Sequence, residues 1–249
     1  MTKRFSYQLY SSRNHGPLGQ TLAMLARHGY SEVEGYGGVY GDPAALRAQL
    51  DEAGLTMPSG HFSVAEMETK PKQVLKTART IGMHTLVMPY LDAAERPTSA
   101  RGWKALAKRL NAIVATYRRE GFGVAWHNHD FEFVKLKDGG VPMALIIENA
   151  PLLDWEIDVA WVARGGANPL KWIKDYGAII TIAHVKDIAP KGTHADEDGW
   201  SDVGHGTLDW PTFMAALAAT RCMHYVMEHD NPADDQRFAK RSIAKAKRF

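Results

Sequence analysis

The residues of greatest chemical interest are acids and histidines that come directly after short apolar runs. Ionisable side chains follow six such runs: Glu34; His61; His127, His129, Asp130 and Glu132; Asp158; His184, Lys186 and Asp187; and Glu228, His229 and Asp230. Carboxylates and imidazoles together are the donors that manganese, zinc, cobalt and iron take in proteins. The pattern therefore predicts metal-assisted chemistry, provided that the fold brings the ends of these runs together.

Each of these residues taken alone has a simpler interpretation. A single histidine at a strand end is more often a hydrogen-bonded packing residue than a metal ligand. Asp158 is well placed to cap a helix over Val159–Arg164, and Lys186 could pair with Asp187 or another acid. The set as a whole is different, because several acids and imidazoles crowded together would repel one another or stay unsatisfied without a cation.

The apolar runs alternate with amphipathic helical stretches, which is typical of a parallel sheet. We predict eight strands, at Phe5–Tyr10, Ser31–Glu34, Met57–Phe62, Thr85–Met88, Gly123–Trp126, Leu153–Ile157, Ile179–Ala183 and His224–Met227. The first predicted helix contains Leu18, Leu22 and Leu25. The other predicted helices are Pro43–Ala53, Lys70–Ile81, Ser99–Glu120, Met143–Asn149, Pro169–Tyr176, Trp210–Ala219 and Asp234–Lys247.

Eight β-then-α units in a chain of this length indicate closure into a (β/α)8 TIM barrel, which we assign to residues 1–249 as one domain. A doubly wound open sheet is the alternative, but no Gly-x-Gly-x-x-Gly follows the first strand to support it. The active site of a (β/α)8 barrel lies at the C-terminal ends of the strands. Asp158, His184, Glu228 and a histidine of the fifth strand should therefore face one another around a divalent metal.

The composition is that of an ordinary globular protein. The 249 residues include 30 Lys and Arg against 28 Asp and Glu, and 45% are hydrophobic. The near-neutral charge argues against a nucleic-acid partner, and we interpret the basic stretch from Arg237 to Arg248 as a solvated helix face. The single cysteine, Cys222, excludes an intrachain disulfide, and no signal peptide or membrane span is recognisable, so we expect a cytoplasmic protein without a membrane partner.

Several segments carry a family resemblance: WHNHDFEF (Trp126–Phe133), WEIDVAWVARGGANP (Trp155–Pro169), IAHVKDI (Ile182–Ile188), VGHGTLDW (Val203–Trp210), VMEHDNP (Val226–Pro232) and, more weakly, SGHFS (Ser59–Ser63). Together they resemble the sugar phosphate isomerase/epimerase-like proteins, which are xylose-isomerase-like TIM barrels. The resemblance implies one divalent metal, Mn2+ in preference to Zn2+, Co2+ or Fe2+, held by residues of the fifth to eighth strands.

Three of the implied ligands match directly: Asp158, His184 and Glu228. The fifth strand departs from the family pattern, because the epimerases carry a glutamate where this chain offers His127 or His129. We choose His127 as the ligand, since it closes the strand, and keep His129 as the second choice or as a base or substrate contact.

The resemblance also implies an activity, namely removal of the proton next to the carbonyl of a keto-sugar or cyclitol. We expect Glu228, His129 or His127 to act on that proton, and His61, Glu34, Lys186, Trp126, Trp161 and His205 to contact the substrate. Loss of the strand-five glutamate argues against symmetric epimerisation. The HNHDFEF subgroup also resembles inosose dehydratases and proteins that cleave 3-keto-glycosides, so a lyase or hydrolase is the alternative.

Two other classes of protein share features of this sequence. A nuclease of the endonuclease IV type would need more ligands and a basic groove, which the near-neutral charge argues against. A non-catalytic sugar-binding barrel would not need so many ionisable groups. The resemblance leaves room for a homodimer and for a separate dehydrogenase that supplies the keto-sugar, since no dinucleotide-binding fingerprint occurs in the chain.

Overall fold

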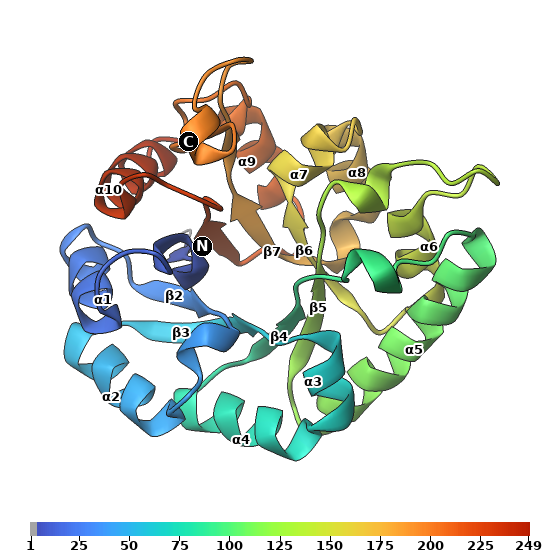
Figure 1. The fold of residues 1–249 in the computed structure, drawn as a ribbon, viewed down its shortest axis with the longest axis horizontal. Helices are drawn as coiled ribbons and strands as arrows, with labels where there is room; N and C mark the ends of the chain where they lie inside the picture. The colour runs from blue at the N-terminus through green and yellow to red at the C-terminus, as the bar shows by residue number, and fades with distance from the viewer. Residues whose placement is uncertain (1–3) are drawn as a thin grey trace.

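The computed structural model describes residues 4–249, and a barrel of eight parallel strands lies at its centre (Figure 1). The strands are β1 (Arg4–Tyr7), β2 (Glu32–Gly35), β3 (Thr56–His61), β4 (Thr85–Met88), β5 (Gly123–His127), β6 (Asp154–Asp158), β7 (Ile180–Val185) and β10 (His224–Met227). They pair in the order β1-β10-β7-β6-β5-β4-β3-β2. An isolated parallel bridge from Gln8 to Glu34 joins the end of β1 to β2. The predicted (β/α)8 barrel is confirmed, although the first three residues of the assigned domain lie outside the described residues.

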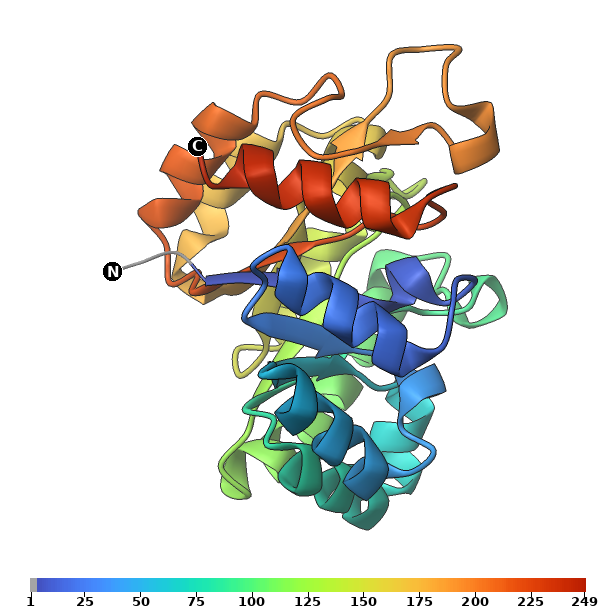
Figure 2. The ribbon, with the colours of Figure 1, turned by 90° about the vertical axis from the view of Figure 1, so that its left-hand side faces the viewer.

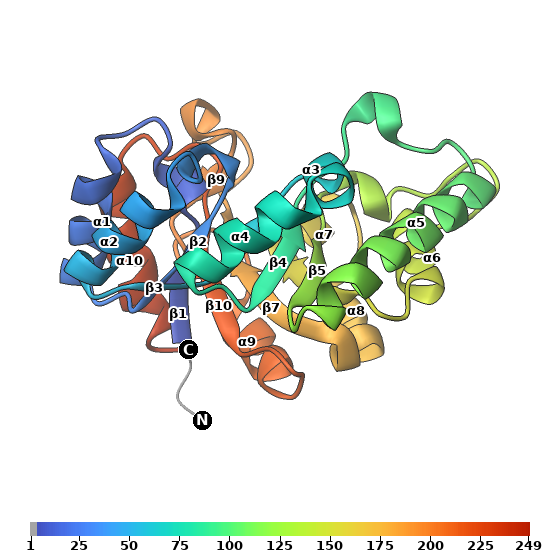
Figure 3. The same ribbon diagram turned by 90° about the horizontal axis from the view of Figure 1, so that it is seen from below.

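The helices surround the barrel, as the end-on and side views show (Figures 1 and 3). They are α1 (Leu18–Arg27), α2 (Pro43–Ala53), α3 (Val64–Thr69), α4 (Pro71–Ile81), α5 (Ala100–Arg119), α6 (Pro142–Asn149), α7 (Val159–Arg164), α8 (Pro169–Tyr176), α9 (Trp210–Ala218) and α10 (Asp235–Ala246). Local signals explain several boundaries. Asp42 caps α2 ahead of Pro43, and Gly54 ends that helix in the left-handed conformation.

Two predicted strands differ from those observed by more than one residue at one end. The first ends at Tyr7 rather than Tyr10, because the side-chain oxygen of Gln8 accepts a hydrogen bond from the Tyr10 backbone N–H (3.1 Å) and starts a short 3-10 helix. The seventh runs on from Ala183 to Val185. The extension places His184 inside β7, where its side-chain direction is fixed by pairing with the neighbouring strands.

A small apolar layer fills the inside of the barrel. Val87, Ala125, Ile182 and Val226 form a buried cluster separate from the larger core between the sheet and the helices. Side chains two residues further along a strand point to the same face. Two residues beyond this layer along β5, β7 and β10 come His127, His184 and Glu228. The apolar layer, which we call the apolar floor, therefore lies directly below these polar side chains.

The segment between β7 and α9 forms a long loop that rises beside the strand ends (orange in Figures 2 and 3). The buried carboxylate of Asp187 holds the two ends of this loop together. It accepts four backbone hydrogen bonds, from Ile188 (2.9 Å), Gly204 (2.9 Å), Gly206 (3.1 Å) and Leu208 (3.1 Å). A Cβ on Gly206 would lie 2.3 Å from that carboxylate, so only glycine fits there. The loop also holds the two-stranded antiparallel pair β8 (Asp187–Ile188) and β9 (Trp200–Ser201).

The last helix closes the ring beside the first, and α10 lies next to α1 (Figure 2). The basic stretch that begins at Arg237 is not simply a solvated face. Arg237 binds Glu197 and Asp202, and Arg241 lies 2.8 Å from Asp202, so α10 is tied to the β7–α9 loop. In the part of the chain that the structure describes, no helix has the length and apolar character needed to cross a membrane.

Candidate metal centre

Strand β6 places two acids on the inner face of the barrel. Glu156 and Asp158 are two residues apart and both are fully buried, so their side chains point in the same direction. Glu156 pairs with His127 across the β5 ladder, and Asp158 pairs with His184 across the β7 ladder. The sequence analysis identified Asp158 but missed Glu156. Side chains two residues apart on a strand point to the same face. Glu156 lies two residues before Asp158 and could have been recognised for that reason as a second acid on the inner face.

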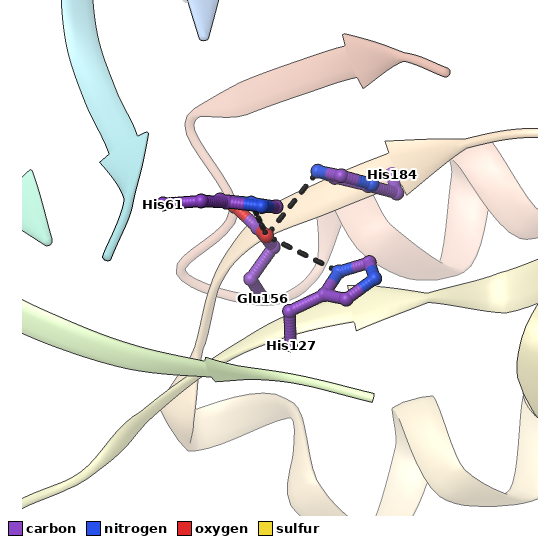
Figure 4. Close-up of side chains that lie close together, drawn as sticks. All are labelled: His61, His127, Glu156 and His184. Carbon is purple, nitrogen blue, oxygen red and sulfur yellow. Dashed lines mark hydrogen bonds and ion pairs between the residues drawn. The ribbon is translucent and has the colours of Figure 1, made fainter. Parts of the chain in front are cut away.

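Glu156 lies at the centre of three imidazole rings (Figure 4). Its Oε2 atom is 2.8 Å from His61 Nε2, 3.2 Å from His127 Nδ1 and 3.2 Å from His184 Nε2. One ligand atom from each of these four residues can be chosen so that all lie within 4.8 Å of one another. We call His61, His127, Glu156 and His184 the deep set.

A second group of four meets the same criterion closer to the strand ends. His127, Asp158, His184 and Glu228 also offer ligand atoms within 4.8 Å of one another, and all four are buried. We call them the upper set, and they are the four residues that the sequence predicted as metal ligands. His127 belongs to both sets and His129 to neither, which favours His127 as the strand-five ligand.

The two oxygens of Asp158 have different surroundings, one suited to capping a helix and the other to binding a metal. Its Oδ1 accepts a hydrogen bond from the Trp161 backbone N–H (2.8 Å) and so caps α7. Its Oδ2 is buried and has no hydrogen-bond partner among the described residues, and it lies 4.0 Å from the Lys186 ammonium. One oxygen thus fixes the side chain, while the other remains available to a ligand.

His184 lies between the two sets. Its Nδ1 is 3.1 Å from Glu228 Oε2, on the side of the upper set. Its Nε2 is 2.7 Å from Glu34 Oε1 and 3.2 Å from Glu156 Oε2, on the side of the deep set. The two nitrogens of one buried ring therefore face two different groups of carboxylates.

Glu34 does not line the cavity, although it was predicted to contact substrate. Gln8 donates a hydrogen bond to its Oε1 (2.9 Å) and Ser59 donates to its Oε2 (2.5 Å). Its Oε1 is also 3.1 Å from His61 Nε2. The Glu34 carboxylate is thus occupied by protein groups and orients the rings of His61 and His184 from below.

Lys186 is fully buried and pairs with acids of the site rather than with Asp187. Its Nζ lies 2.5 Å from Asp230 Oδ2 and 3.2 Å from Glu228 Oε2, and 4.0 Å from the centre of the Trp200 ring. Burial opposes its charge, but Asp230, Glu228 and Asp158 hold its pKa above the usual range. Lys186 therefore neutralises one side of the upper set.

The histidines of the centre differ in their protonation. Burial and the neighbouring His184 ring hold the pKa of His127 well below its usual value. Burial and the Lys186 ammonium lower the pKa of His129 to about 3. Burial acts in the same direction on His61, but Glu156 and Glu34 outweigh it and raise the pKa of that ring to about 9. His127 and His129 thus keep free lone pairs.

The acids differ in the same way. Burial and Glu34 act to raise the pKa of Glu156, but His184 and His61 bring it down to about 2. Burial raises the pKa of Asp158 to about 7, although Lys186 acts against the rise. A cation near Asp158 would favour its charged form. The donor types of the upper set and the unpartnered, buried Asp158 Oδ2 fit a divalent transition metal.

A cavity of 440 Å³ opens above these residues. Small-molecule sites have volumes of roughly 300–1,000 Å³. His61, His127, His129, Glu228 and Asp230 line its polar side. The rest of its wall is formed by the tyrosines Tyr10, Tyr36 and Tyr90 and by Gly37, Ser63, Glu66 and Pro89. The cavity is thus large enough for a sugar-sized molecule.

Three other predicted substrate contacts are not among the residues that line the cavity. Trp126 is fully buried and alternates with His127, so it faces the helices, and its indole N–H donates to Glu132 (3.1 Å). Trp161 packs near the site, with its ring centre 5.2 Å from that of His129. His205 is exposed on the β7–α9 loop and is not among the residues that line the cavity. The structure therefore does not bring Trp126 or His205 to the site.

Glu132 is a further residue that sequence analysis left without a function. It is fully buried, and its carboxylate accepts hydrogen bonds from the Trp126 indole (3.1 Å) and the His129 backbone N–H (2.9 Å). Burial raises its pKa to about 8. The last acid of HNHDFEF thus fixes the loop that carries His129.

The fold is a TIM barrel with a mixed group of carboxylates and imidazoles at its strand ends that could hold a metal ion. The family described as "Xylose isomerase-like TIM barrel" matches residues 22–248, and the chain belongs to that family. Membership covers nearly all of the barrel.

Individual relatives are more distant. The rhizopine catabolism protein MocC of Rhizobium meliloti is 25% identical over 236 residues, which cover 82% of this chain and 71% of that protein. A sugar phosphate isomerase/epimerase from Parabacteroides distasonis superposes with a TM-score of 0.82 at 19% identity, over 99% of this chain and 94% of that one. The IOLI protein with a bound zinc atom superposes with a TM-score of 0.76 at 18% identity, over 98% and 95% of the two chains.

Proposed function

We propose that this protein is a divalent-metal-dependent enzyme that removes the proton next to the carbonyl of a keto-sugar or cyclitol. The observation that carries the proposal is the upper set, His127, Asp158, His184 and Glu228, at a cavity of 440 Å³. The structures that superpose on this chain include two named as sugar phosphate isomerase/epimerases, which supports the same substrate class. The zinc atom in the IOLI structure supports a bound divalent metal.

His127, Asp158, His184 and Glu228 would hold the ion. When bound, it supplies Lewis-acid stabilisation of negative charge that develops on a substrate oxygen. The apolar floor of Val87, Ala125, Ile182 and Val226 closes the barrel below the donors and keeps water from that side. Asn128 fixes the strand that carries Asp158, because its side chain donates to the Asp158 carbonyl and accepts from the Asp158 N–H.

Glu228 and His129 are the two groups that we propose for proton transfer. Both line the cavity. Burial acts to raise the pKa of Glu228, but Lys186 and His184 bring it well below its usual value, so its carboxylate is ionised. The ring of His129 is neutral, and its Nδ1 has no hydrogen-bond partner among the described residues. One carboxylate and one imidazole can thus exchange protons with different atoms of one substrate.

An elimination is the alternative, in which proton removal is followed by departure of a leaving group. The asymmetry of the site favours it over epimerisation. Strand β5 offers an imidazole in place of the glutamate that a symmetric pair of bases requires. Asp230, which lines the cavity and accepts a hydrogen bond from Lys186, could protonate a leaving oxygen.

Hydrogen exchange tests the proton-transfer step. The metal-loaded protein is incubated in D2O with keto-sugars, inososes and 3-keto-glycosides, and the carbon next to the carbonyl is followed by NMR. We expect deuterium to enter there, and to enter far more slowly with metal-stripped protein or with Asp158→Asn. The absence of exchange into every substrate, with loaded protein that is folded, would refute the proposal.

A further inference from the structure

We propose that the deep set, His61, His127, Glu156 and His184, is a second divalent-cation position below the one that the proposed function uses. Neither proton abstraction nor elimination requires this second ion. The two positions share His127 and His184. The inference stands on the geometry of the deep set and does not depend on the reaction.

The donor atoms of the deep set are spaced as a metal requires. Zn–N and Zn–O bonds of about 2.0–2.2 Å in tetrahedral geometry place neighbouring donors about 3.3–3.5 Å apart. Glu156 Oε2 lies 2.8, 3.2 and 3.2 Å from the nitrogens of His61, His127 and His184. Outward movements of a few tenths of an ångström, most of them at His61, would give an ion its full bond lengths. His61 lines the cavity, so its ring borders open space on one side.

Two buried atoms of the deep set have no hydrogen-bond partner among residues 4–249. They are Glu156 Oε1 and His127 Nδ1, on side chains that are 0% and 2% exposed. The His127 nitrogen points at Glu156 Oε2 without hydrogen-bond geometry (Figure 4). Leaving buried polar atoms unpaired costs about 1–3 kcal/mol each. An ion bound by His127 Nδ1 and by both oxygens of Glu156 would satisfy them, which is why these atoms point to a ligand.

His184 allows both positions to be filled together. Its Nε2 belongs with the deep set and its Nδ1 faces Glu228 of the upper set. Once its N–H proton is lost, the His184 ring could bind two ions, one through each nitrogen, as a bridging imidazolate. His127 is also shared and would have to bridge in the same way, with Nδ1 toward the deep ion. Two buried carboxylates, Glu34 and Glu156, supply negative charge around the deep position.

The two positions should prefer different metals. The deep set has three imidazoles and one carboxylate, whereas the upper set has two of each. Imidazole-rich sets suit zinc, copper, nickel and cobalt, and added carboxylates extend the range toward manganese. We therefore assign a zinc-like ion to the deep position and allow a harder ion such as Mn2+ at the upper one.

Metal titration of the full chain tests the inference. Chelator-stripped protein is dialysed against Zn2+ or Co2+, the bound metal is counted by elemental analysis, and bound Co2+ is followed by its visible absorption. We expect two ions per chain in the unaltered protein and one in Glu156→Gln. Asp158→Asn is the matched control, because it alters the upper set alone and should keep the tetrahedral cobalt signal that Glu156→Gln loses.

A second variant covers the risk that Glu156→Gln does not fold. His61→Asn changes a side chain at the cavity wall and should also remove one ion, with an unchanged circular dichroism spectrum. One ion per chain that is kept by Glu156→Gln and His61→Asn but lost in Asp158→Asn would overturn the deep position and leave the proposed function standing. One ion with the opposite pattern would support the deep position and refute the upper ligand assignment.

Discussion

The carboxylate of Asp187 offers a sharp test of how the β7–α9 loop is held. Asp187→Asn changes only one oxygen into an amino group, so the size of the side chain is kept. The carboxylate accepts two backbone hydrogen bonds on each oxygen, from Ile188 and Leu208 on Oδ1 and from Gly204 and Gly206 on Oδ2. An asparagine can accept only one of these pairs, and its NH2 group then faces the other two donors.

The magnitude follows from the two backbone N–H groups that lose their acceptor. Each buried donor without a partner costs about 1–3 kcal/mol, and water can reach part of this loop, so we expect a loss of about 2–4 kcal/mol in the free energy of unfolding. For a protein of this size, 1 kcal/mol corresponds to roughly 2–4 °C in melting temperature. The expected decrease is therefore about 5–15 °C.

Thermal unfolding followed by circular dichroism measures the decrease, and hydrogen exchange should show faster exchange in residues 189–209. Asp196→Asn is the control, since that side chain is exposed in the same loop. If Asp187→Asn melted within about 1 °C of the unaltered protein and exchanged at the same rate in this loop, the account of Asp187 as its anchor would be wrong.

Three further predictions concern the centre and its support. Lys186→Met leaves the buried carboxylate of Glu228 and the partly exposed carboxylate of Asp230 without the Lys186 ammonium and should cost about 3–5 kcal/mol in urea unfolding; stability equal to the unaltered protein would contradict this. Glu132 has a pKa raised by burial to about 8, so stability should decline as the pH rises from its unfolded value toward 8, and Glu132→Gln should flatten that decline; parallel pH profiles would refute it. A divalent ion at 100 times its dissociation constant should add about 2.7 kcal/mol, and identical melting of loaded and chelator-stripped protein would exclude a bound metal.

The barrel and the upper set were predictable because both follow from simple periodicity. Eight apolar runs separated by helical stretches leave few architectures, and closure of the sheet brings Asp158, His184 and Glu228 to the same end. Strand alternation also decides between Trp126 and His127, since neighbours on a strand face opposite sides. Applied at Trp126, the same rule would have placed that ring among the helices rather than at the cavity.

Other features depend on contacts that no local pattern carries. Glu156 stands inside a strand that is buried throughout, and its environment comes from His61 on β3 and His184 on β7. The position of His205 follows from a loop whose path is set by Asp187, 18 residues before it in the chain. Long-range geometry of this kind becomes visible only when the strands have been assembled.

The strand order has a consequence for synthesis of the protein on the ribosome. Strand β1 pairs along its length with β10, so the first strand to be made must wait for the last one before its edge is covered. Until then β1 and β7 both present unpaired backbone, and such open edges favour association between chains. Glu228 and Asp230 follow β10 directly, so the same late step that seals the barrel also completes the metal centre. A nascent chain that lacks β10 should therefore depend on chaperones and bind metal poorly.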